Sequence, residues 1–581
     1  MSSAGRLSLL TVSRRARRAI VLASLAIATA APLAASASQP VYLSDLRKFP
    51  PIAEKGTLTL LDKPSTATPA VLAVAFRNDP RVRTSVTVRF DRDAVTLHDD
   101  GANGDAQAGD GVFSAVVTFD ADALQRSIAT RNQALEKNPV VPIFDKRQVV
   151  SHASLSPIAL PLQPGVALDL SQLTGLLATI DPARELMIRH PSVVEDPTRT
   201  FDPCTGAGTP MGPWTFGYLM TQMANQSATG LDPAVFTRRW LQRWEFDQVV
   251  NDFLVPRRLD IQNDIINPWP KLADGRLDLA RAPFRLLAIV NRVDLRENLL
   301  YGGGSAGELR FVFGALNLSQ CNSPLQFTVI FEYGVKQPSC SALVAYAQQW
   351  HNLGSLVIGS AAYNAALQAI TDPVVVAGAD PSKPNGSALN QLRTNEIAIA
   401  PPGGQWELRE FKIDPLVSGH LSEVTVKQTP STSLNNQAVI RDFINDNEAA
   451  ILAGTYVVPL DYPGMTPFLG GSSITPFGVF WNGPAVINNL EARHLFSLGT
   501  CNGCHAGETN TAFTHVKPRP AGVPSALSDF LTGLNQPTPN PVPPPASHVF
   551  GDLDRRAQDL DALVNSSCLF QVFQRPLLMS H

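Results

Sequence analysis

The chain has 581 residues, of which 44% are hydrophobic and 17% are charged, and its 47 basic and 50 acidic side chains leave a formal net charge of −3. A chain of this length predicts several domains, and the hydrophobic fraction is large enough to form their cores. A nucleic-acid partner usually requires a basic face on the protein. Because the charge of this chain is balanced, we expect no nucleic-acid partner.

The N-terminus has the three parts of a secretory signal peptide. Arginines cluster between Arg14 and Arg18, an apolar run covers residues 19–31, and a small-residue cleavage site follows at residues 35–37. The run is short and rich in alanine, which favours export with cleavage over a membrane anchor. We therefore expect residues 1–37 to be removed, the protein to be exported to the bacterial periplasm or outside the cell, and no transmembrane segment to remain.

The next region, residues 40–164, is rich in strand patterns. Residues 71–76 form an apolar run, and residues 86–90 alternate between apolar and polar side chains. Such short runs, bounded by turn residues, are typical of strands. We expect a β-sandwich here.

An acidic, glycine-rich stretch, residues 98–113, lies between two of these strands. Asp100, Asp105 and Asp110 offer the carboxylate oxygens that calcium prefers, although their spacing is not that of an EF-hand. The alternative is a tight turn in which Asp and Asn side chains bond their own backbone. The stretch resembles the loop of immunoglobulin-like modules in bacterial secreted and surface proteins, and the resemblance covers little beyond the loop.

The middle region, residues 165–480, mixes helix and strand patterns. Asp232 followed by proline marks a helix start. Three apolar runs, residues 284–290, 309–313 and 327–331, are spaced as neighbouring strands of one sheet. We expect a mixed α+β region, and its sequence indicates no function. The glycine-rich residues 302–307 match a dinucleotide-binding pattern, but they precede a strand and do not join a strand to a helix, so we reject that function.

Four cysteines lie outside the C-terminal motif described next. They are Cys204, Cys321, Cys340 and Cys568. In an oxidising compartment an even set indicates two disulfides, with three possible connectivities. We favour Cys321 with Cys340, which closes the ends of one strand, and therefore Cys204 with Cys568.

The motif with the clearest chemistry is Cys501-Asn502-Gly503-Cys504-His505. Two cysteines two residues apart, followed by histidine, match the attachment signature of a c-type haem. Each thiol adds to one vinyl group of the porphyrin while the imidazole binds the iron. The alternatives are a local disulfide or thioredoxin-like redox pair, and half of a zinc site, which needs two further ligands.

Helix patterns lie on both sides of this motif, from Gly483 to Gly499 and from Asp552 to Val564. Residues 481–581 therefore resemble a small cytochrome c. The resemblance implies a mainly α-helical segment with one covalent haem, held by Cys501 and Cys504 with His505 as proximal ligand. The segment departs from the family because the only methionine after the motif is Met579, near the terminus.

Several groups can be the second axial ligand of the iron. His515 lies ten residues after His505, far enough to reach around a porphyrin edge, and Lys517 and Arg519 beside it are suited to pair with the propionates. We favour His515. The alternatives are an open site and three other residues, namely Met579, His494 and His548.

These features predict an exported c-type haem protein with a redox or electron-transfer role and an unidentified redox partner. An open axial site would permit a haem-dependent oxidoreductase activity. The competing interpretation is a secreted or surface binding or structural protein whose cysteine pair is a disulfide and which binds no haem. Haem staining of the denatured protein separates the two.

Overall fold

The structure is a computed structural model of the chain, which divides into two compact units, Met1–Pro50 and Pro51–His581. It describes residues 53–564 except for 77–84, 91–92, 123, 127, 130–131, 133–140, 146–147, 154–157, 170–179, 297–305, 322, 398–405, 415–418, 453, 455, 476–480, 482–486, 506–507, 512–513, 533–537, 540–546 and 549. The expected signal peptide and Met579 therefore lie outside the described residues.

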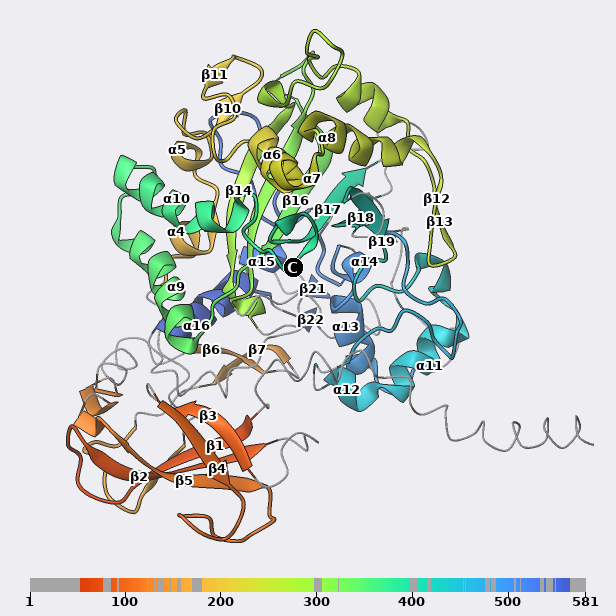
Figure 1. The fold of residues 1–581 in the computed structure, drawn as a ribbon. Helices are drawn as coiled ribbons and strands as arrows, with labels where there is room; N and C mark the ends of the chain where they lie inside the picture. Colours follow the sequence, from red (N-terminus) through yellow and green to blue (C-terminus); the bar gives the residue numbers. More distant parts are fainter. Residues whose placement is uncertain are drawn as a thin grey trace, which may run out of the picture. The chain divides into compact units, whose positions relative to one another are not determined.

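The N-terminal strands form one six-stranded antiparallel sheet with the order β3-β4-β5-β2-β1-β8 (Figure 1). Its strands are β1 (Ala53–Leu60), β2 (Thr68–Phe76), β3 (Ser85–Phe90), β4 (Asp93–His98), β5 (Val112–Phe119) and β8 (Ala167–Asp169). A separate ribbon pairs β6 (Val141–Asp145) with β7 (Gln148–Ala153). Leu72 and Val74 on β2 are buried while their neighbours are only half-buried, so one face forms the core.

The expected β-sandwich is wrong for the described strands, because six of them pair in one sheet and β6 and β7 form only a separate two-stranded ribbon. The strands themselves could be predicted from the sequence, because alternation of apolar and polar residues indicates which side chains of a strand are buried. Alternation does not report how strands divide between sheets, because that depends on pairing between residues far apart in the chain.

The second sheet has eight antiparallel strands, and we call it the central sheet. Seven of them have the order β19-β18-β17-β16-β15-β14-β9, and β20 pairs with β18. The strands are β9 (Met187–Ile188), β14 (Phe284–Arg292), β15 (Glu308–Leu316), β16 (Pro324–Gly334), β17 (Leu389–Ile397), β18 (Trp406–Ile413), β19 (Leu421–Val424) and β20 (Ser473–Thr475). The three apolar runs of the middle region are β14, β15 and β16, so their prediction as neighbours is confirmed.

One face of the central sheet is apolar and is covered by helices. These include α6 (Phe216–Ala224), α8 (Pro233–Leu241) and α10 (Ala361–Val375) (Figure 1). Phe216 of α6 stacks on Phe284 with ring centroids 4.0 Å apart and contacts Phe313 edge-on. Asp232 accepts a hydrogen bond from the backbone of Val235, which confirms the predicted helix start.

The remaining α-helices and strands are as follows. The helices are α4 (Pro182–Glu185), α5 (Pro191–Val194), α7 (Gln226–Thr229), α9 (Cys340–Asn352), α11 (Ala438–Asp446), α12 (Glu448–Leu452), α13 (Leu490–Leu498), α14 (Cys501–Cys504), α15 (Asp529–Thr532) and α16 (Asp552–Val564). The strands are β10 (Phe201–Asp202), β11 (Ala207–Gly208), β12 (Gln248–Val250), β13 (Phe253–Val255), β21 (Thr538–Pro539) and β22 (Ser547–His548).

The C-terminal segment is not a mainly α-helical, cytochrome-like domain, which corrects the expectation. The helix α16 has the predicted bounds, but the helix before the motif begins only at Leu490, and irregular chain separates the short helices. The segment also bonds to the middle region. The backbone N–H of Cys501 donates to Thr429 Oγ1 at 2.9 Å, and Arg519 donates to the carbonyl of Leu286 at 3.0 Å. Helix patterns predicted local structure but not this dependence on the central sheet.

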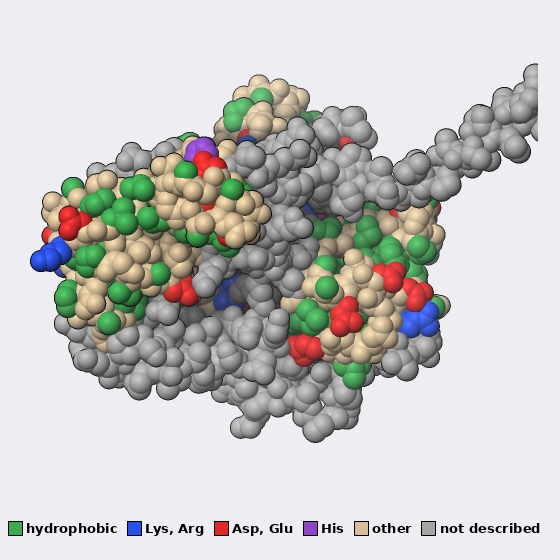
Figure 2. Space-filling model, turned by 90° about the horizontal axis from the view of Figure 1, so that it is seen from below, with side chains coloured by type: hydrophobic (Ala, Val, Ile, Leu, Met, Phe, Trp, Pro, Cys, Tyr) green, Lys and Arg blue, Asp and Glu red, His purple; other side chains and the backbone are tan. Residues whose placement is uncertain are grey.

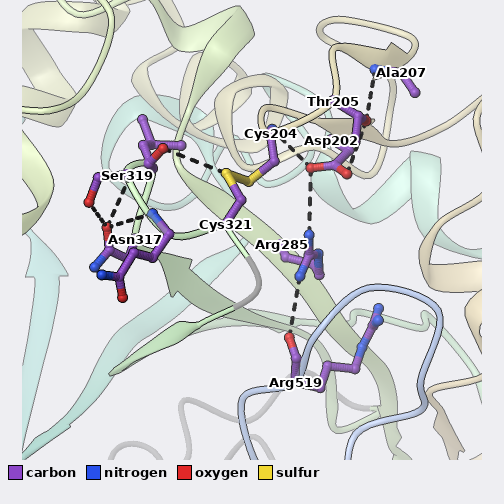
Figure 3. Close-up of a disulfide and its surroundings, with 11 residues drawn as sticks. Asp202, Cys204, Thr205, Ala207, Arg285, Asn317, Ser319, Cys321 and Arg519 are labelled. Atoms are coloured by element: carbon purple, nitrogen blue, oxygen red, sulfur yellow. Dashed lines mark hydrogen bonds and ion pairs between the residues drawn. A yellow bond between two sulfur atoms is a disulfide. The ribbon is translucent and has the colours of Figure 1, made fainter.

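The structure contains a disulfide between Cys204 and Cys321 (Figure 3). Both favoured pairings are therefore wrong, since each assigned one of these cysteines to another partner. The error arose because Cys204 and Cys321 are 117 residues apart in the sequence. Closeness in sequence is a weak guide to disulfide pairing, since the fold decides which cysteines meet.

We predict that the other bridge joins Cys340 to Cys568, the pair that remains when Cys204 and Cys321 are bonded. Cys340 is the first residue of α9, and α9 packs against α16, whose last residue precedes Cys568 by four positions. Proteolysis of the oxidised protein without reductant should yield two disulfide-linked peptide pairs in mass spectrometry. An alkylated, unlinked Cys568 peptide from the same digest would contradict this prediction.

Among the described residues, no helix has the length and apolar character needed to cross a bilayer. On the face drawn in Figure 2, basic side chains appear in isolated places among hydrophobic and acidic ones. The described residues on that face therefore form no continuous basic patch.

Candidate functional site

The cysteine motif occupies one tight helical turn. The helix α14 begins after Thr500, whose side chain accepts a hydrogen bond from the backbone of Gly503. A side chain at position 503 would be impossible here, since a Cβ atom would lie 2.0 Å from the carbonyl oxygen of Ser497. Glycine between Cys501 and Cys504 therefore allows this turn to pack closely against the end of α13.

Both motif cysteines are buried and neither is in a disulfide. Burial raises the pKa of the Cys501 thiol and raises that of Cys504 well above its usual value. Both therefore stay protonated at neutral pH, whereas a redox-active thioredoxin-like cysteine needs a lowered pKa. The structure supports neither the local disulfide nor the reactive dithiol among the alternatives.

The two predicted iron ligands lie next to each other. The ring of His505 stacks on Trp406, with centroids 4.4 Å apart and planes 15° from parallel. The ring centroid of His515 is 4.5 Å from that of His505. Imidazoles on opposite sides of an iron need centroids about 6 Å apart, because each metal–nitrogen bond is about 2 Å long. In this arrangement the two rings leave no room for an iron between them.

His515 has partners on both ring nitrogens. Its Nε2 lies 3.4 Å from Cys504 Sγ, and its Nδ1 lies 2.7 Å from Ser528 Oγ. Burial, with smaller contributions from His505 and two nearby arginines, holds the pKa of His515 well below its usual value. The imidazole is therefore neutral, the form that binds metals.

The other ligand candidates are placed elsewhere. His494 is fully buried on α13 and bonds to Glu508, which also pairs with Arg493. The side chains of His548 and Met579 lie outside the described residues. Arg519, expected beside a propionate, instead pairs with Glu195 and bonds the backbone of Leu286.

A cavity lies between the motif and the polar face of the central sheet. It holds about 650 Å³ of space between atoms, a figure that includes the part open to solvent. Cys501, His505 and His515 line one side. The apolar part of the wall includes Met187, Val290, Val312, Ile330, Leu408 and Leu531.

Four arginines and one glutamate add charge to this cavity, and sequence reasoning missed all of them. They are Arg292, Arg310, Arg393, Arg556 and Glu332. Each arginine forms an ion pair. Arg292 pairs with Asp294 at 2.9 Å and Arg310 with Glu308 at 2.7 Å. Arg393 pairs with Glu410 at 3.0 Å and Arg556 with Asp552 at 2.5 Å. The available signal was the alternation of charged with apolar residues in β15, Glu308-Leu309-Arg310-Phe311, which is unusual for a buried strand. We call the four arginines the arginine wall.

A second buried charge cluster lies near β18. Arg409 is fully buried and lies within ion-pair distance of three glutamates, at 3.2 Å for Glu407, 3.0 Å for Glu423 and 3.5 Å for Glu396. Burial, together with the charge of Glu407, overcomes the attraction of Arg409 and raises the pKa of Glu396 to about 7. The attraction of Arg409 and Arg258 outweighs burial for Glu407, whose pKa is lowered.

A second cavity, of about 640 Å³, lies elsewhere on the central sheet. Asp202, Arg285 and Trp214 are among its lining residues. Arg285 pairs with Asp202 at 3.5 Å and donates to the carbonyl of Arg519, close to the disulfide (Figure 3). Arg285 is thus on the same strand as Arg292 but outside the first cavity.

In the acidic loop, the carboxylates that gather are Asp99, Asp105 and Asp110, whose ligand atoms lie within 4.8 Å of one another. Asp100, which we had expected in this group, is not part of it, and Asp99 takes its place. The side chain of Asp100 accepts a hydrogen bond from the backbone N–H of Ala102. Asp99 itself accepts from three backbone N–H groups, at residues 109–111. These bonds are the ones that the turn interpretation requires, and the grouping of carboxylates is compatible with a metal ion.

Comparisons with known proteins found no matching family model, no matching curated protein and no matching solved structure.

Proposed function

We propose that the cavity beside Cys501 and His505 holds one covalently attached haem and that the chain is an exported redox protein. The observation that carries this proposal is that a thiol and the imidazole of one CxxCH motif line a single cavity. Haem at this place would supply single-electron exchange.

The residues around the cavity suit the parts of a porphyrin. The unbonded thiols of Cys501 and Cys504 are in the state needed for thioether bonds. Met187, Val312 and Ile330 offer an apolar surface for the ring, and the arginine wall offers charge-assisted donors for its carboxylates. Both thiols are buried in the folded chain, so attachment would precede folding, as expected when haem is added to an exported, unfolded chain.

The chain's own residues also orient the proximal imidazole. Trp406 stacks on His505 and limits the rotation of its ring. His515 bonds to Cys504 and Ser528 and lies too close to His505 to be the opposing ligand without moving. This spacing favours the alternative in which His505 alone would hold the iron, and such a site would permit small-molecule chemistry.

The test is covalent haem in the full chain, made with its signal sequence in a bacterial host that has haem-ligation machinery. We expect haem staining of the denatured band and a Soret band that acid and organic solvent cannot extract. The double substitution Cys501→Ser/Cys504→Ser should abolish both signals. The matched control Cys204→Ser/Cys321→Ser removes the same number of thiols and should retain covalent haem.

Well-folded wild-type protein without covalent haem would contradict the proposal. It would favour the competing function, a secreted binding or structural protein. The competing interpretation assumed a disulfide between Cys501 and Cys504, whereas the two thiols are unbonded in this structure.

A further inference from the structure

Three guanidinium groups of the arginine wall are held in the same way. Arg292 uses Nε and Nη2 to bond both oxygens of Asp294, at 2.9 and 3.0 Å. Arg310 uses the same two nitrogens on Glu308, at 2.9 and 2.7 Å. Arg393 uses them on Glu410, at 3.1 and 3.0 Å. In each case one edge of the planar group is fixed by a carboxylate, so the third nitrogen, Nη1, is held in a defined position.

The third nitrogens of Arg292 and Arg310 lack a full set of acceptors among the described residues. Nη1 of Arg292 is buried and has no hydrogen-bond partner among the described residues. Nη1 of Arg310 and of Arg393 lie 3.4 and 3.6 Å from Oε1 of Glu332, which are ion-pair distances. That glutamate oxygen is itself buried and without a hydrogen bond to any described group. Oε1 of Glu332 thus lies at ion-pair distance from two guanidiniums but forms a hydrogen bond with neither of them.

Such an arrangement is costly unless something else completes it. A buried donor without an acceptor loses about 1–3 kcal/mol of hydrogen-bond free energy relative to water. Arg556, the fourth arginine, has its pKa lowered to about 10 by burial and by the charge of Arg292. The part of this lowering that comes from Arg292 is repulsion between neighbouring cations, which an anion in the cavity would relieve.

We propose that the arginine wall is a binding site for a carboxylate or a tetrahedral oxyanion, with Nη1 of Arg292 and of Arg310 as its principal donors. Two sources have this chemistry. One is the pair of porphyrin carboxylates, in which case the inference deepens the proposed function; the other is a free anion that binds whether or not haem is present. Glu332, the one carboxylate among the described residues lining the cavity, opposes either anion.

The test uses the full chain produced without haem-ligation machinery and titrated with inorganic phosphate by calorimetry at constant ionic strength. We expect saturable binding. Glu332→Gln keeps the size of the side chain and removes its charge, so it should tighten phosphate binding by about tenfold, equivalent to 1.4 kcal/mol. A gain in affinity cannot result from misfolding, which makes this variant the decisive one.

Two further variants locate the site. Arg310→Gln should weaken phosphate binding by at least about tenfold, which is 1.4 kcal/mol. Arg285→Gln removes an arginine of the same sheet that lines the other cavity, so phosphate affinity should stay unchanged. Thermal melts of each variant establish that it is folded before titration.

The haem-loaded protein distinguishes the two sources. Loss of phosphate binding on haem attachment would assign the site to the porphyrin carboxylates, and unchanged binding would assign it to a free anion. The inference is overturned if the folded haem-free chain shows no saturable phosphate binding, or if Glu332→Gln fails to tighten it. Absence of covalent haem would contradict the haem proposal alone and would leave the anion site to be judged by the phosphate titrations.

Discussion

Replacing Arg409 with methionine should destabilise the chain by about 4 kcal/mol or more, because the change leaves buried carboxylates without their cation. Arg409 pairs with Glu407, Glu423 and Glu396, donates to the carbonyl of Pro256 at 2.7 Å, and lies over the ring of Trp244. Methionine fills a similar volume but carries no charge to neutralise the three glutamates. The measurement is the free energy of unfolding from urea denaturation, monitored by circular dichroism.

The loss should be smaller at pH 5 than at pH 8. Burial raises the pKa of Glu396 to about 7 and also raises that of Glu423. A carboxyl with a raised pKa in the folded state contributes stability that is present below its ordinary pKa and is lost as the pH rises through the raised value. Protonation at pH 5 thus removes part of the uncompensated charge that the variant leaves.

The control is Arg441→Met, which breaks a partly exposed ion pair with Asp442 and should cost less than about 1 kcal/mol. An Arg409→Met protein that unfolds at the wild-type urea concentration would show that the buried network adds little. It would also weaken the interpretation of the arginine wall, which relies on the same kind of buried pairing.

Replacing Glu508 with glutamine should cost about 3 kcal/mol at pH 7 and loosen the chain that follows the cysteine motif. Glu508 is buried and bonds to His494 and Arg493 of α13, so it joins the chain after the motif to the helix before it. Burial alone would raise its pKa, but these two partners outweigh burial and lower it. Glutamine keeps the shape and removes the charge that Arg493 requires.

The pH dependence has the opposite sign from that of the Arg409 variant. A carboxyl with a lowered pKa stabilises the fold above its ordinary value, near 4.5, and this contribution is lost as the pH falls through the lowered value. The difference between wild type and Glu508→Gln should therefore shrink from pH 7 toward pH 4. Glu448→Gln, which keeps its hydrogen bond with Asn489, is the matched control and should change little at either pH. Equal losses for both variants would exclude a specific role for Glu508.

The burial of charged side chains explains why these substitutions are expected to have large effects. Arg292, Arg409 and Arg493 are each at most 1% exposed. A buried ion pair need not stabilise a fold more than an apolar pair would, but removal of one partner is strongly destabilising. The first of these arginines lines the cavity, where its pairing with Asp294 also fixes the nitrogen that we assign to anion binding.

The sequence by itself determined features that depend on neighbouring residues. Asp232 followed by proline identified the start of α8, the pattern from Asp552 to Val564 matched α16, and three apolar runs marked β14, β15 and β16. The CxxCH motif placed two thiols and an imidazole within five residues. Each of these signals rests on backbone geometry or side-chain spacing within one element, which the order of residues specifies directly.

Only the tertiary structure decided which distant residues meet. Cys204 forms a disulfide with Cys321, 117 residues away in the sequence. Asp99, and not Asp100 as expected, lies close to Asp105 and Asp110. The arginine wall draws Arg292, Arg310 and Arg393 from three strands and Arg556 from α16, and together they line one cavity with residues of the cysteine motif. Strand order and packing set these contacts through burial and pairing across the whole sheet, and no local spacing in the sequence records that outcome.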